Sequence, residues 1–416
     1  MAAFLIKDVR IFTGEDEIPN GFVYIQSGLI RSFGSTVPDK LDSGILVISK
    51  PNHTLLPGLI DCHIHASKGN EQALYQSIKF GVTTVMDMHN EAVNVNKLKI
   101  LAKADKDCAD FKSAGMAATI DNGWPIPVVT AHDKSEETMA EIATWPKLKT
   151  KADVDAYMKT NVMETGADYI KLMHESGKAM GWEFTEPTQE LQAMVVAAAH
   201  SYGRVAVAHA TAMKDHLTVL RAGVDGLAHT FFDQPPTQEL IDAYKVNNAW
   251  LNPTLTAMGS LTTEGKEVQE RLAHDPRVQK HLGEEETARL CQCMDFHAEG
   301  SKLEYAYESV RQLKNAGIDI LCGSDAATPA RGTAWGASLH QELRIFVDEC
   351  GFTPVEALRA ATSLTAKRFG FRDRGMIAED KRADLLLVEG NPLEDIDNTL
   401  NIRGVWRDGR MCSEYA

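Results

Sequence analysis

The chain has 416 residues, 44% of them hydrophobic, which is enough to bury the core of one large barrel and a small second unit. Its formal net charge is −15, and an acidic chain gains nothing from phosphate backbones or anionic lipid surfaces. We therefore expect no nucleic acid and no membrane as a partner. Seven scattered cysteines and an N-terminus without a signal-peptide pattern favour a cytoplasmic protein with reduced thiols.

Both ends of the sequence have the texture of short β-strands. Alternating apolar and polar runs bounded by glycine occupy residues 4–14, 21–34, 45–50, 382–390 and 402–411. Because both ends of the chain have this alternating pattern and the middle does not, we expect strands from the two ends to pair. The sequence thus predicts a small β-sandwich domain formed by residues 1–56 and 376–416.

The middle of the chain alternates helix with strand. A helical stretch, a glycine and a β-rich run recur as IKFGVTTVMDM, METGADYIKLM, HSYGRVAVAHA, LRAGVDGLAHT and KNAGIDILCGSD. Glycine is the preferred residue just after a helix, and alternating strands and helices imply a parallel sheet. The number of units favours an α/β fold of the closed (β/α)8 (TIM) barrel type over residues 57–375. An open doubly wound sheet is less favoured, because no GxGxxG follows the first strand.

Two stretches interrupt this alternation. Residues 119–150 form a long loop after the third expected strand, and its Trp124, Pro125, Pro127 and His132 suggest a partly rigid lid. Residues 257–300 are charged and mostly helical, and they separate the seventh strand, WLNPTL, from the eighth. Long insertions in compact domains often serve as lids or binding loops, although a surface insertion without a function is about as common.

Polar side chains recur at the ends of the expected barrel strands. The segment PGLIDCHIHAS ends a buried run with two histidines on one face of the strand. Similar offsets from the preceding glycine place one polar residue at the end of four later strands, so the complete set is His63, His65, Lys171, His209, His229 and Asp325. Active sites of such barrels lie at the C-terminal ends of the strands. We therefore expect these six side chains to converge on one rim.

This set of side chains predicts a metal site. Neutral imidazoles and a carboxylate are metal ligands, and a histidine-rich set favours zinc. Each residue alone is more often structural: a core histidine, a surface lysine or a capping aspartate. Six at matching offsets favour two divalent metal ions. An inward-facing Lys171 would lose its costly charge by adding carbon dioxide, and the resulting carbamate would bridge both ions.

The ordered motifs resemble those of the amidohydrolase superfamily over nearly the whole chain. The resemblance implies that His63 and His65 bind the more buried metal, that His209 and His229 bind the outer metal, and that Lys171 is carboxylated. CGSDA is similar to the motif that carries the strand-eight aspartate, Asp325. Within the superfamily the chain resembles the imidazolonepropionase-like branch, which includes Xaa-Pro dipeptidases and ochratoxinase-type amidases and suggests a homo-oligomer. The stretch DNGWPIPVVTAHD replaces the glycine-rich stretch that usually follows the third strand in this branch. This difference lies where the substrate would bind.

The predicted activity is binuclear hydrolysis of an amide bond in a small molecule such as an N-acyl amino acid, a dipeptide or a cyclic amide. A metal-bridging hydroxide would attack the carbonyl, with Asp325 as general base and then general acid. His132 or His174 would stabilise the oxyanion, and Lys178 or Arg331 would bind a substrate carboxylate.

Three alternative activities remain open on the same site. It could cleave a lactone or a carbamate, or it could act as a mononuclear deaminase or decarboxylase, which a bridging Lys171 argues against. A non-catalytic scaffold is the third alternative. Such relatives typically lose ligands, and none is missing from this sequence.

Overall fold

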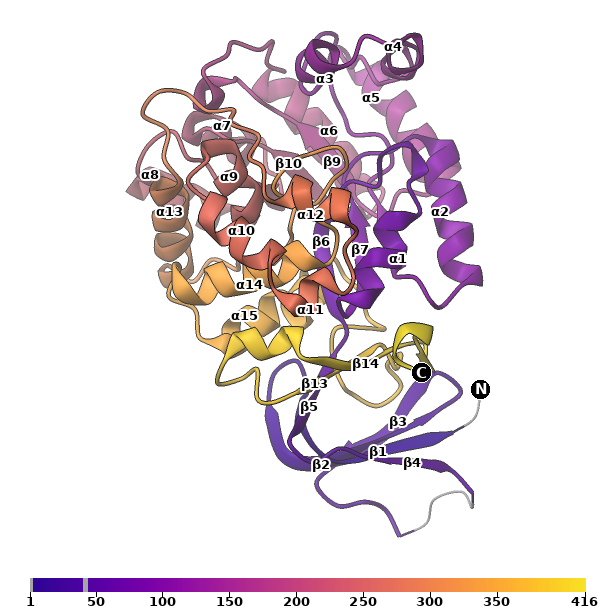
Figure 1. The fold of residues 1–416 in the computed structure, drawn as a ribbon. Helices are drawn as coiled ribbons and strands as arrows, with labels where there is room; N and C mark the ends of the chain where they lie inside the picture. Colours follow the sequence, from indigo (N-terminus) through magenta and orange to yellow (C-terminus); the bar gives the residue numbers. More distant parts are fainter. Residues whose placement is uncertain (1–2, 40–43) are drawn as a thin grey trace.

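The computed structural model of the protein describes residues 3–39 and 44–416 (Figure 1). Strands from both ends of the chain form one eight-stranded sheet: β1 (Phe4–Phe12), β2 (Glu17–Gln26), β3 (Leu29–Gly34), β4 (Leu46–Ser49), β5 (His53–Pro57), β13 (Leu385–Glu389), β14 (Ile402–Arg407) and β15 (Arg410–Met411). Their order is β15-β14-β13-β5-β1-β2-β3, with β4 also paired to β1. This sheet occupies the lower end of the molecule in Figure 1.

The antiparallel pair of β5 and β13 brings the two ends of the chain together, with Leu55 opposite Leu387. Both leucines are fully buried and belong to a separate apolar cluster with Ile6, Ile11 and Val23. The alternating runs therefore form strands where the sequence predicted them. The exact domain boundaries at 56 and 376 stay a prediction.

Seven further strands form two parallel sheets. One contains β6 (Leu59–Ile64), β7 (Val82–Asp87) and β8 (Asp110–Ser113), and the other contains β9 (Ile170–Met173), β10 (Ala206–His209), β11 (Gly226–Ala228) and β12 (Trp250–Asn252). All neighbours within these sheets run parallel. The protein therefore has a mixed α/β fold.

Isolated parallel bridges connect the two sheets at both sides. Ala118, beyond β8, pairs with Leu172 of β9, while Ile320 pairs with Leu251 and Ala326 pairs with Ile64. The segment 318–325 was predicted as a regular eighth strand, and it is not one.

The amides of this segment find partners on three different elements. Leu321 N donates to the carbonyl of Leu251, Cys322 N to that of Ala360, and Asp325 N to that of His63. A central strand shares its amides between the strands on its two sides, so the donation from Cys322 N to Ala360, in α15, interrupts the regular ladder.

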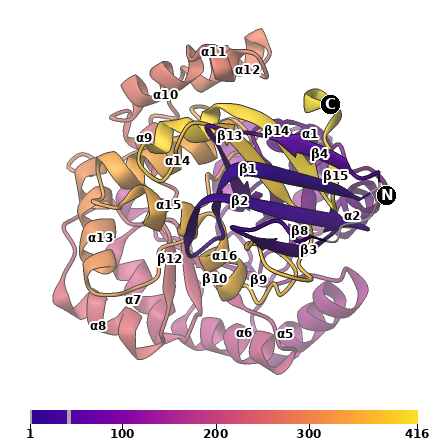
Figure 2. The ribbon, with the colours of Figure 1, turned by 90° about the horizontal axis from the view of Figure 1, so that it is seen from below.

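Helices surround the parallel sheets, as Figure 2 shows from below. Their bounds are α1 (Gln72–Lys79), α2 (Ala92–Ala104), α3 (Ile126–His132), α4 (Glu136–Ala143), α5 (Lys151–Met158), α6 (Gln189–Ser201), α7 (Met213–Arg221), α8 (Gln238–Val246), α9 (Leu255–Thr262), α10 (Lys266–Ala273), α11 (Pro276–Gln279), α12 (Glu284–Leu290), α13 (Leu303–Asn315), α14 (Ala337–Asp348), α15 (Pro354–Ala360) and α16 (Ser363–Arg368). Short turns of other pitch are η1 (Ser67–Gly69), η2 (Lys159–Glu164), η3 (Lys178–Met180), η4 (Ile396–Leu400) and η5 (Ser413–Tyr415).

Side chains of β9 and β10 alternate between two apolar clusters. Ile170 and Ala206 pack with the helices, whereas Tyr169 and Val207 belong to the cluster that the strands enclose. Because successive side chains of a strand point to opposite faces, Lys171 and His209 lie on the enclosed face with Tyr169 and Val207. The alternation predicted from the sequence is confirmed here.

The stretch 119–150, predicted as a long loop, contains the helices α3 and α4 at the upper end of the molecule (Figure 1). Ser135 caps α4, because its side chain accepts a hydrogen bond from Thr138 N. Ile126, Ile142 and Trp145 form their own buried cluster beneath these helices. The stretch is therefore a packed helical insertion. The helical character expected for residues 257–300 is present in α9 to α12.

All seven cysteines are free, and five of them are buried, in line with the reduced thiols expected from the sequence. No helix within residues 3–39 and 44–416 combines the length and apolar character needed to span a lipid bilayer.

Candidate active site

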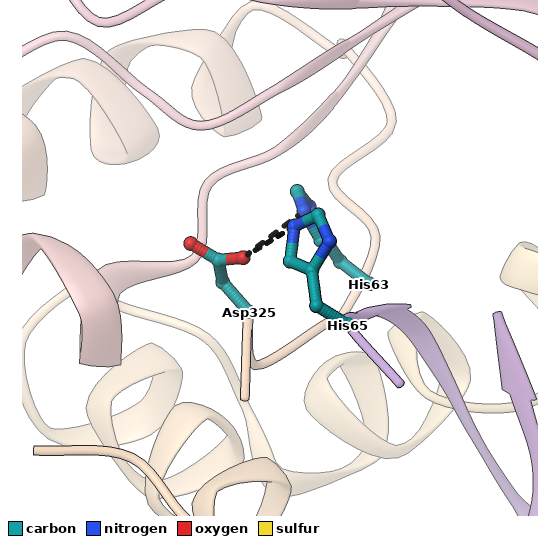
Figure 3. Close-up of side chains that lie close together, drawn as sticks. All are labelled: His63, His65 and Asp325. Atoms are coloured by element: carbon teal, nitrogen blue, oxygen red, sulfur yellow. Dashed lines mark ion pairs between the residues drawn. The ribbon is translucent and has the colours of Figure 1, made fainter. Parts of the chain in front are cut away.

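Two histidines and an aspartate meet where β6 ends. Asp325 Oδ1 lies 3.2 Å from His63 Nε2 and 3.3 Å from His65 Nε2 (Figure 3). One nitrogen of each ring and one carboxylate oxygen all lie within 4.8 Å of one another. His63 has no exposed surface, while the side chains of His65 and Asp325 keep 24% and 20% of theirs. This arrangement can hold a metal ion that solvent or a substrate still reaches.

The other two predicted histidines extend this group. The ring of His229 lies 4.8 Å from that of His63 and 4.6 Å from that of His209, measured between centroids. His229 Nδ1 is also 3.8 Å from Asp325 Oδ2. Three of the four imidazoles, those of His63, His65 and His229, therefore lie near the Asp325 carboxylate, and His209 of β10 lies beside His229.

Lys171 is buried beside these rings, on the strand next to His209. Its side chain is 1% exposed, and Nζ has no hydrogen-bond partner among the described residues. Burial lowers the pKa of Lys171 from 10.5 to about 7, and the charge of Asp325 opposes part of that shift. A neutral amine is the form that can add carbon dioxide.

The electrostatics favour neutral imidazoles around an ionised carboxylate. Burial lowers the pKa of His63 to about 4 and the pKa values of His209 and His229 well below their ordinary range. Burial alone would raise the pKa of Asp325, but interaction with His63 and His229 holds it well below its usual value. Neutral imidazole and carboxylate are the forms that bind a metal.

Within this set of six residues, two buried nitrogens, Lys171 Nζ and His63 Nε2, lack a hydrogen-bond partner among the described residues. Buried polar atoms are nearly always satisfied, so such atoms in the same site point to a missing ligand. The residues present therefore fit a metal centre. They would hold it through the four histidines and Asp325, with Lys171 between them.

Three of the histidine rings are oriented by residues that the sequence did not single out. His63 Nδ1 lies 3.2 Å from Asn252 Oδ1, His209 Nε2 lies 3.1 Å from Glu175 Oε2, and His229 Nδ1 lies 2.8 Å from Thr254 Oγ1. Partners of this kind fix the tautomer and the plane of a metal-binding imidazole.

Asp61 connects β6 to the segment that carries Asp325. Its Oδ1 accepts hydrogen bonds from the amides of His63 (3.2 Å) and Ser324 (3.0 Å), and its Oδ2 accepts one from Ser324 Oγ (2.6 Å). Asp325 and His229 have φ angles of 54° and 74°, a region that residues other than glycine rarely adopt. Such conformations cluster at functional sites, where surrounding contacts hold them in place.

The predicted substrate-binding residues are more dispersed. His132 is exposed at the end of α3, and the nearest recorded contact of its ring is the Val128 carbonyl at 3.0 Å. Lys178 is half exposed, with Nζ 3.2 Å from Asp233 Oδ2. Arg331 is exposed and forms no ion pair within the described ranges. Among the described residues, no contact joins these three side chains to the histidine cluster, so their roles stay predictions.

His174, the fourth predicted substrate-binding residue, is buried. It lies with Glu186 and Asp215 rather than with the ligand histidines. Its predicted role as oxyanion donor therefore also stays a prediction.

An aromatic group borders the site beside His209. The Trp124 ring stacks on that of His209 at 4.9 Å with an interplanar angle of 22°. Phe184 packs on Trp124 at 5.4 Å, and Trp182 lies between Phe184 and Phe296. We call Trp124, Phe184, Trp182 and Phe296 the aromatic wall. Its members come from three separate loops, so the sequence alone did not indicate it.

His89 lies at the edge of the site. It follows β7, and the charges of His65 and Lys171 contribute to the lowering of its pKa, after burial and the opposing effect of Glu91. Its Nδ1 accepts a hydrogen bond from the amide of Ala117, and its Nε2 is buried without a hydrogen-bond partner among the described residues.

Comparison with known proteins places the site in context. Residues 54–412 match the profile described as the Amidohydrolase family. A stretch of 102 residues is 36% identical to an imidazolonepropionase of Deinococcus deserti and covers 24% of this chain and 25% of that protein. Over 255 residues the chain is 26% identical to the ochratoxinase of Aspergillus niger, covering 59% of this chain and 46% of the relative. The matched regions thus span about a quarter of the length of the imidazolonepropionase and about half of the length of the ochratoxinase.

Among solved structures, a Xaa-Pro dipeptidase with methionine bound in its active site superposes with a TM-score of 0.75. The two chains are 23% identical, and the superposition covers 99% of each. This likeness establishes a shared fold.

Proposed function

This chain belongs to the amidohydrolase family, and from that premise we propose that it is a metal-dependent hydrolase that cleaves a carbon–nitrogen bond in a small amide. One observation carries the proposal. The carboxylate of Asp325 contacts His63 and His65 directly and approaches His229, while an unpartnered Lys171 is buried alongside. A structural histidine would hydrogen-bond through both ring nitrogens, whereas Nε2 of His63 lies near the Asp325 carboxylate without a hydrogen-bond partner among the described residues.

We infer two divalent zinc ions, which would be held by His63, His65, Lys171, His209, His229 and Asp325. When bound, they would polarise the substrate carbonyl and make a water-derived nucleophile available at neutral pH. Lys171 joins the two halves of this set once its neutral amine has added carbon dioxide. The carbamate also removes the cost of a buried ammonium group.

Asp325 is the proposed proton carrier. Its Oδ2 lies farther from the histidines than Oδ1, at 3.8 Å from His229 Nδ1, so it is the freer atom for receiving a proton. The low pKa of Asp325 keeps the carboxylate ionised and ready to act as base. The proton then passes from Oδ2 to the leaving amine, so that one residue serves as base and as acid.

We infer that the eight strand-like segments close into one (β/α)8 barrel, with residues 1–56 and 376–416 as the small domain. The isolated bridges at Ala118, Ile320 and Ala326 support closure, because they join neighbouring segments at each gap between the two parallel sheets. The site then lies at the C-terminal ends of the strands, where barrel enzymes carry out their chemistry.

The aromatic wall suggests the substrate class. Trp124 covers one face of His209, so any group bound next to the metal ligands would meet an aromatic surface. Apolar and aromatic groups pack favourably there. We therefore propose an N-acyl amino acid, a dipeptide or a cyclic amide with an apolar or aromatic side chain. A carboxylate on it would reach Lys178 or Arg331, and His132 would assist at the oxyanion.

Metal analysis joined to a substrate panel tests this function. Purified protein should hold about two equivalents of divalent metal at these six residues, and chelation followed by metal return should abolish and then restore amide hydrolysis. The panel should pair each aromatic N-acyl amino acid with its ester and with its alanine counterpart. Folded protein with no metal at these residues, or with turnover of none of the amides, would contradict the proposal.

A further inference from the structure

A second group of potential ligands lies outside the set described above. His174 follows β9, Glu186 precedes α6, and Asp215 lies in the first turn of α7. One ligand atom from each lies within 4.8 Å of the others. His174 is 1% exposed and Asp215 is fully buried, while the Glu186 side chain is 35% exposed and opens the group to solvent.

Distances within the group lie at or beyond the limit of a hydrogen bond. His174 Nε2 lies 3.5 Å from Glu186 Oε2 and 3.9 Å from Asp215 Oδ1. Both His174 Nε2 and Asp215 Oδ1 are buried and have no hydrogen-bond partner in the described ranges. Ligands about 2.1 Å from a tetrahedral ion lie about 3.4 Å apart, so these separations suit atoms arranged around one cation.

Each carboxylate has one oxygen held by the protein and one turned toward His174. Asp215 Oδ2 accepts hydrogen bonds from the amide (3.0 Å) and the hydroxyl (2.7 Å) of Ser176. Glu186 Oε1 accepts one from Lys214 Nζ at 3.0 Å. This is how residues around a metal site commonly orient ligating carboxylates.

The local charge also calls for a cation. Glu175, Glu186 and Asp215 lie close enough to interact electrostatically, and Lys214 is the cation that accompanies them. With every carboxylate ionised the group has a surplus of two negative charges, which one divalent cation would neutralise. Two of these carboxylates, those of Glu175 and Asp215, have no exposed surface, so the surplus is costly without a counter-ion.

We propose that His174, Glu186 and Asp215 form an additional site for one divalent cation of the zinc, cobalt or manganese type, separate from the set around Asp325. One nitrogen and two carboxylate oxygens suit such ions, and water through the open side at Glu186 completes the coordination. His174 Nδ1 lies 3.5 Å from the side-chain nitrogen of Gln192, too long a contact to fix the tautomer of the ring, so Nε2 is available as the ligand atom.

A cation at this site would tie three elements together. It would join the loop after β9 to α7 and to the segment that carries Phe184, whose ring supports Trp124. Thr185, next to Glu186, also pairs with Gly123 of the lid segment. The ion would therefore hold the aromatic wall in place without touching the ligands around Asp325.

Metal counting on matched variants of the full-length protein tests the proposal. Wild type, Glu186→Gln and Asp215→Asn are dialysed against a zinc buffer, with Glu183→Gln as an exposed control on the same segment. Wild type and control should hold one equivalent more than the other two variants. Cobalt titration should show the same difference through loss of one set of visible absorption bands. Equal counts in all four folded proteins would overturn the proposal.

The same comparison in a Lys171→Ala background separates this site from the proposed catalytic centre. Lys171→Ala should lower the total count, and Glu186→Gln should remove one further equivalent from it. If the centre around Asp325 holds no metal, wild type should still hold the one equivalent that Glu186→Gln loses. If Lys171→Ala and the double variant hold the same amount, the additional site is refuted.

Discussion

The Nε2 atom of His209 lies 3.1 Å from Oε2 of Glu175, a carboxylate with no exposed surface. The same oxygen accepts a hydrogen bond from Thr211 Oγ1 at 2.7 Å, while Oε1 accepts one from the amide of Gly177 at 2.7 Å. Both oxygens of Glu175 are therefore fixed. The ring of His209 is held with Nδ1 as the nitrogen available for a metal.

We expect Glu175→Gln to weaken metal binding about 10–100-fold, because loss of such a partner lets the imidazole rotate and lowers its basicity. The measurement is competition against a chromogenic chelator. Glu190→Gln, a change in the first turn of α6 that leaves Glu175 in place, should bind metal as wild type does. Unchanged affinity in Glu175→Gln would show that this contact does not support the ligand.

Lys171→Ala should lose activity and at least one metal equivalent while keeping its secondary structure, because other residues make the enclosed apolar cluster. Mass spectrometry under native conditions should detect carbon dioxide on wild type only. Lys171→Arg should also fail, since a guanidinium group stays protonated and cannot be carboxylated. Excess acetate or another short carboxylic acid should restore part of the activity of Lys171→Ala. Near-normal turnover with full metal content in Lys171→Arg would refute the bridging role.

Trp124→Ala should raise the KM for aromatic substrates about tenfold, or about 1.4 kcal/mol, through loss of the face that covers His209. Metal content should not change, since Trp124 supplies no ligand. Trp124→Phe keeps an aromatic face, so its KM should lie between those of wild type and Trp124→Ala. Steady-state kinetics on the matched aromatic and alanine substrates provide the comparison, and an equal rise in KM for both would assign Trp124 to general packing.

The pH dependence of stability should include a contribution from Glu141 in α4. Burial, and then the charge of Glu91, raise the pKa of Glu141 from 4.5 to about 7. The folded protein thus keeps this proton to a higher pH than the unfolded chain does. That contribution to the free energy of unfolding is complete below pH 4.5 and is lost as the pH rises toward 7.

Urea unfolding between pH 4.5 and pH 7 measures this effect. Glu141→Gln cannot ionise, so its midpoint should fall less over this range than the midpoint of wild type. Glu136→Gln on the same helix is exposed and should leave the pH profile unchanged. Identical profiles for Glu141→Gln and wild type would remove Glu141 from the explanation.

The sequence indicated where the proposed ligands lie on the strands because strand geometry is regular. A glycine ends each helix, a strand of about five residues follows, and the next polar residue stands at the rim. For Lys171 and His209 this counting was sufficient, since both side chains lie on the enclosed face of β9 and β10. The eighth segment did not follow the rule in detail, because its amides turn to three partners.

The residues that hydrogen-bond to these histidines could not be predicted from the sequence in the same way. Asn252 and Thr254 flank a proline in WLNPT, and which ring each would meet depends on how β11 and β12 pair. Glu175 sits in a loop whose course depends on α7. For α4 a local signal did exist, since Ser135 before Glu-Glu-Thr is a capping sequence. The stretch IPVVTAH of α3 carries β-branched residues that favour a strand, and tertiary packing overrides that preference.

The carboxylate of Asp61 and the hydroxyl of Ser324, which are 263 positions apart in the chain, form one short hydrogen bond. During synthesis on the ribosome, His63 and His65 emerge long before Asp325, so the early part of the chain presents two imidazoles without their carboxylate. We expect such a nascent chain to capture metal weakly. Metal loading would then follow completion of the polypeptide, and an incomplete translation product would not compete with finished protein for scarce metal in the cell.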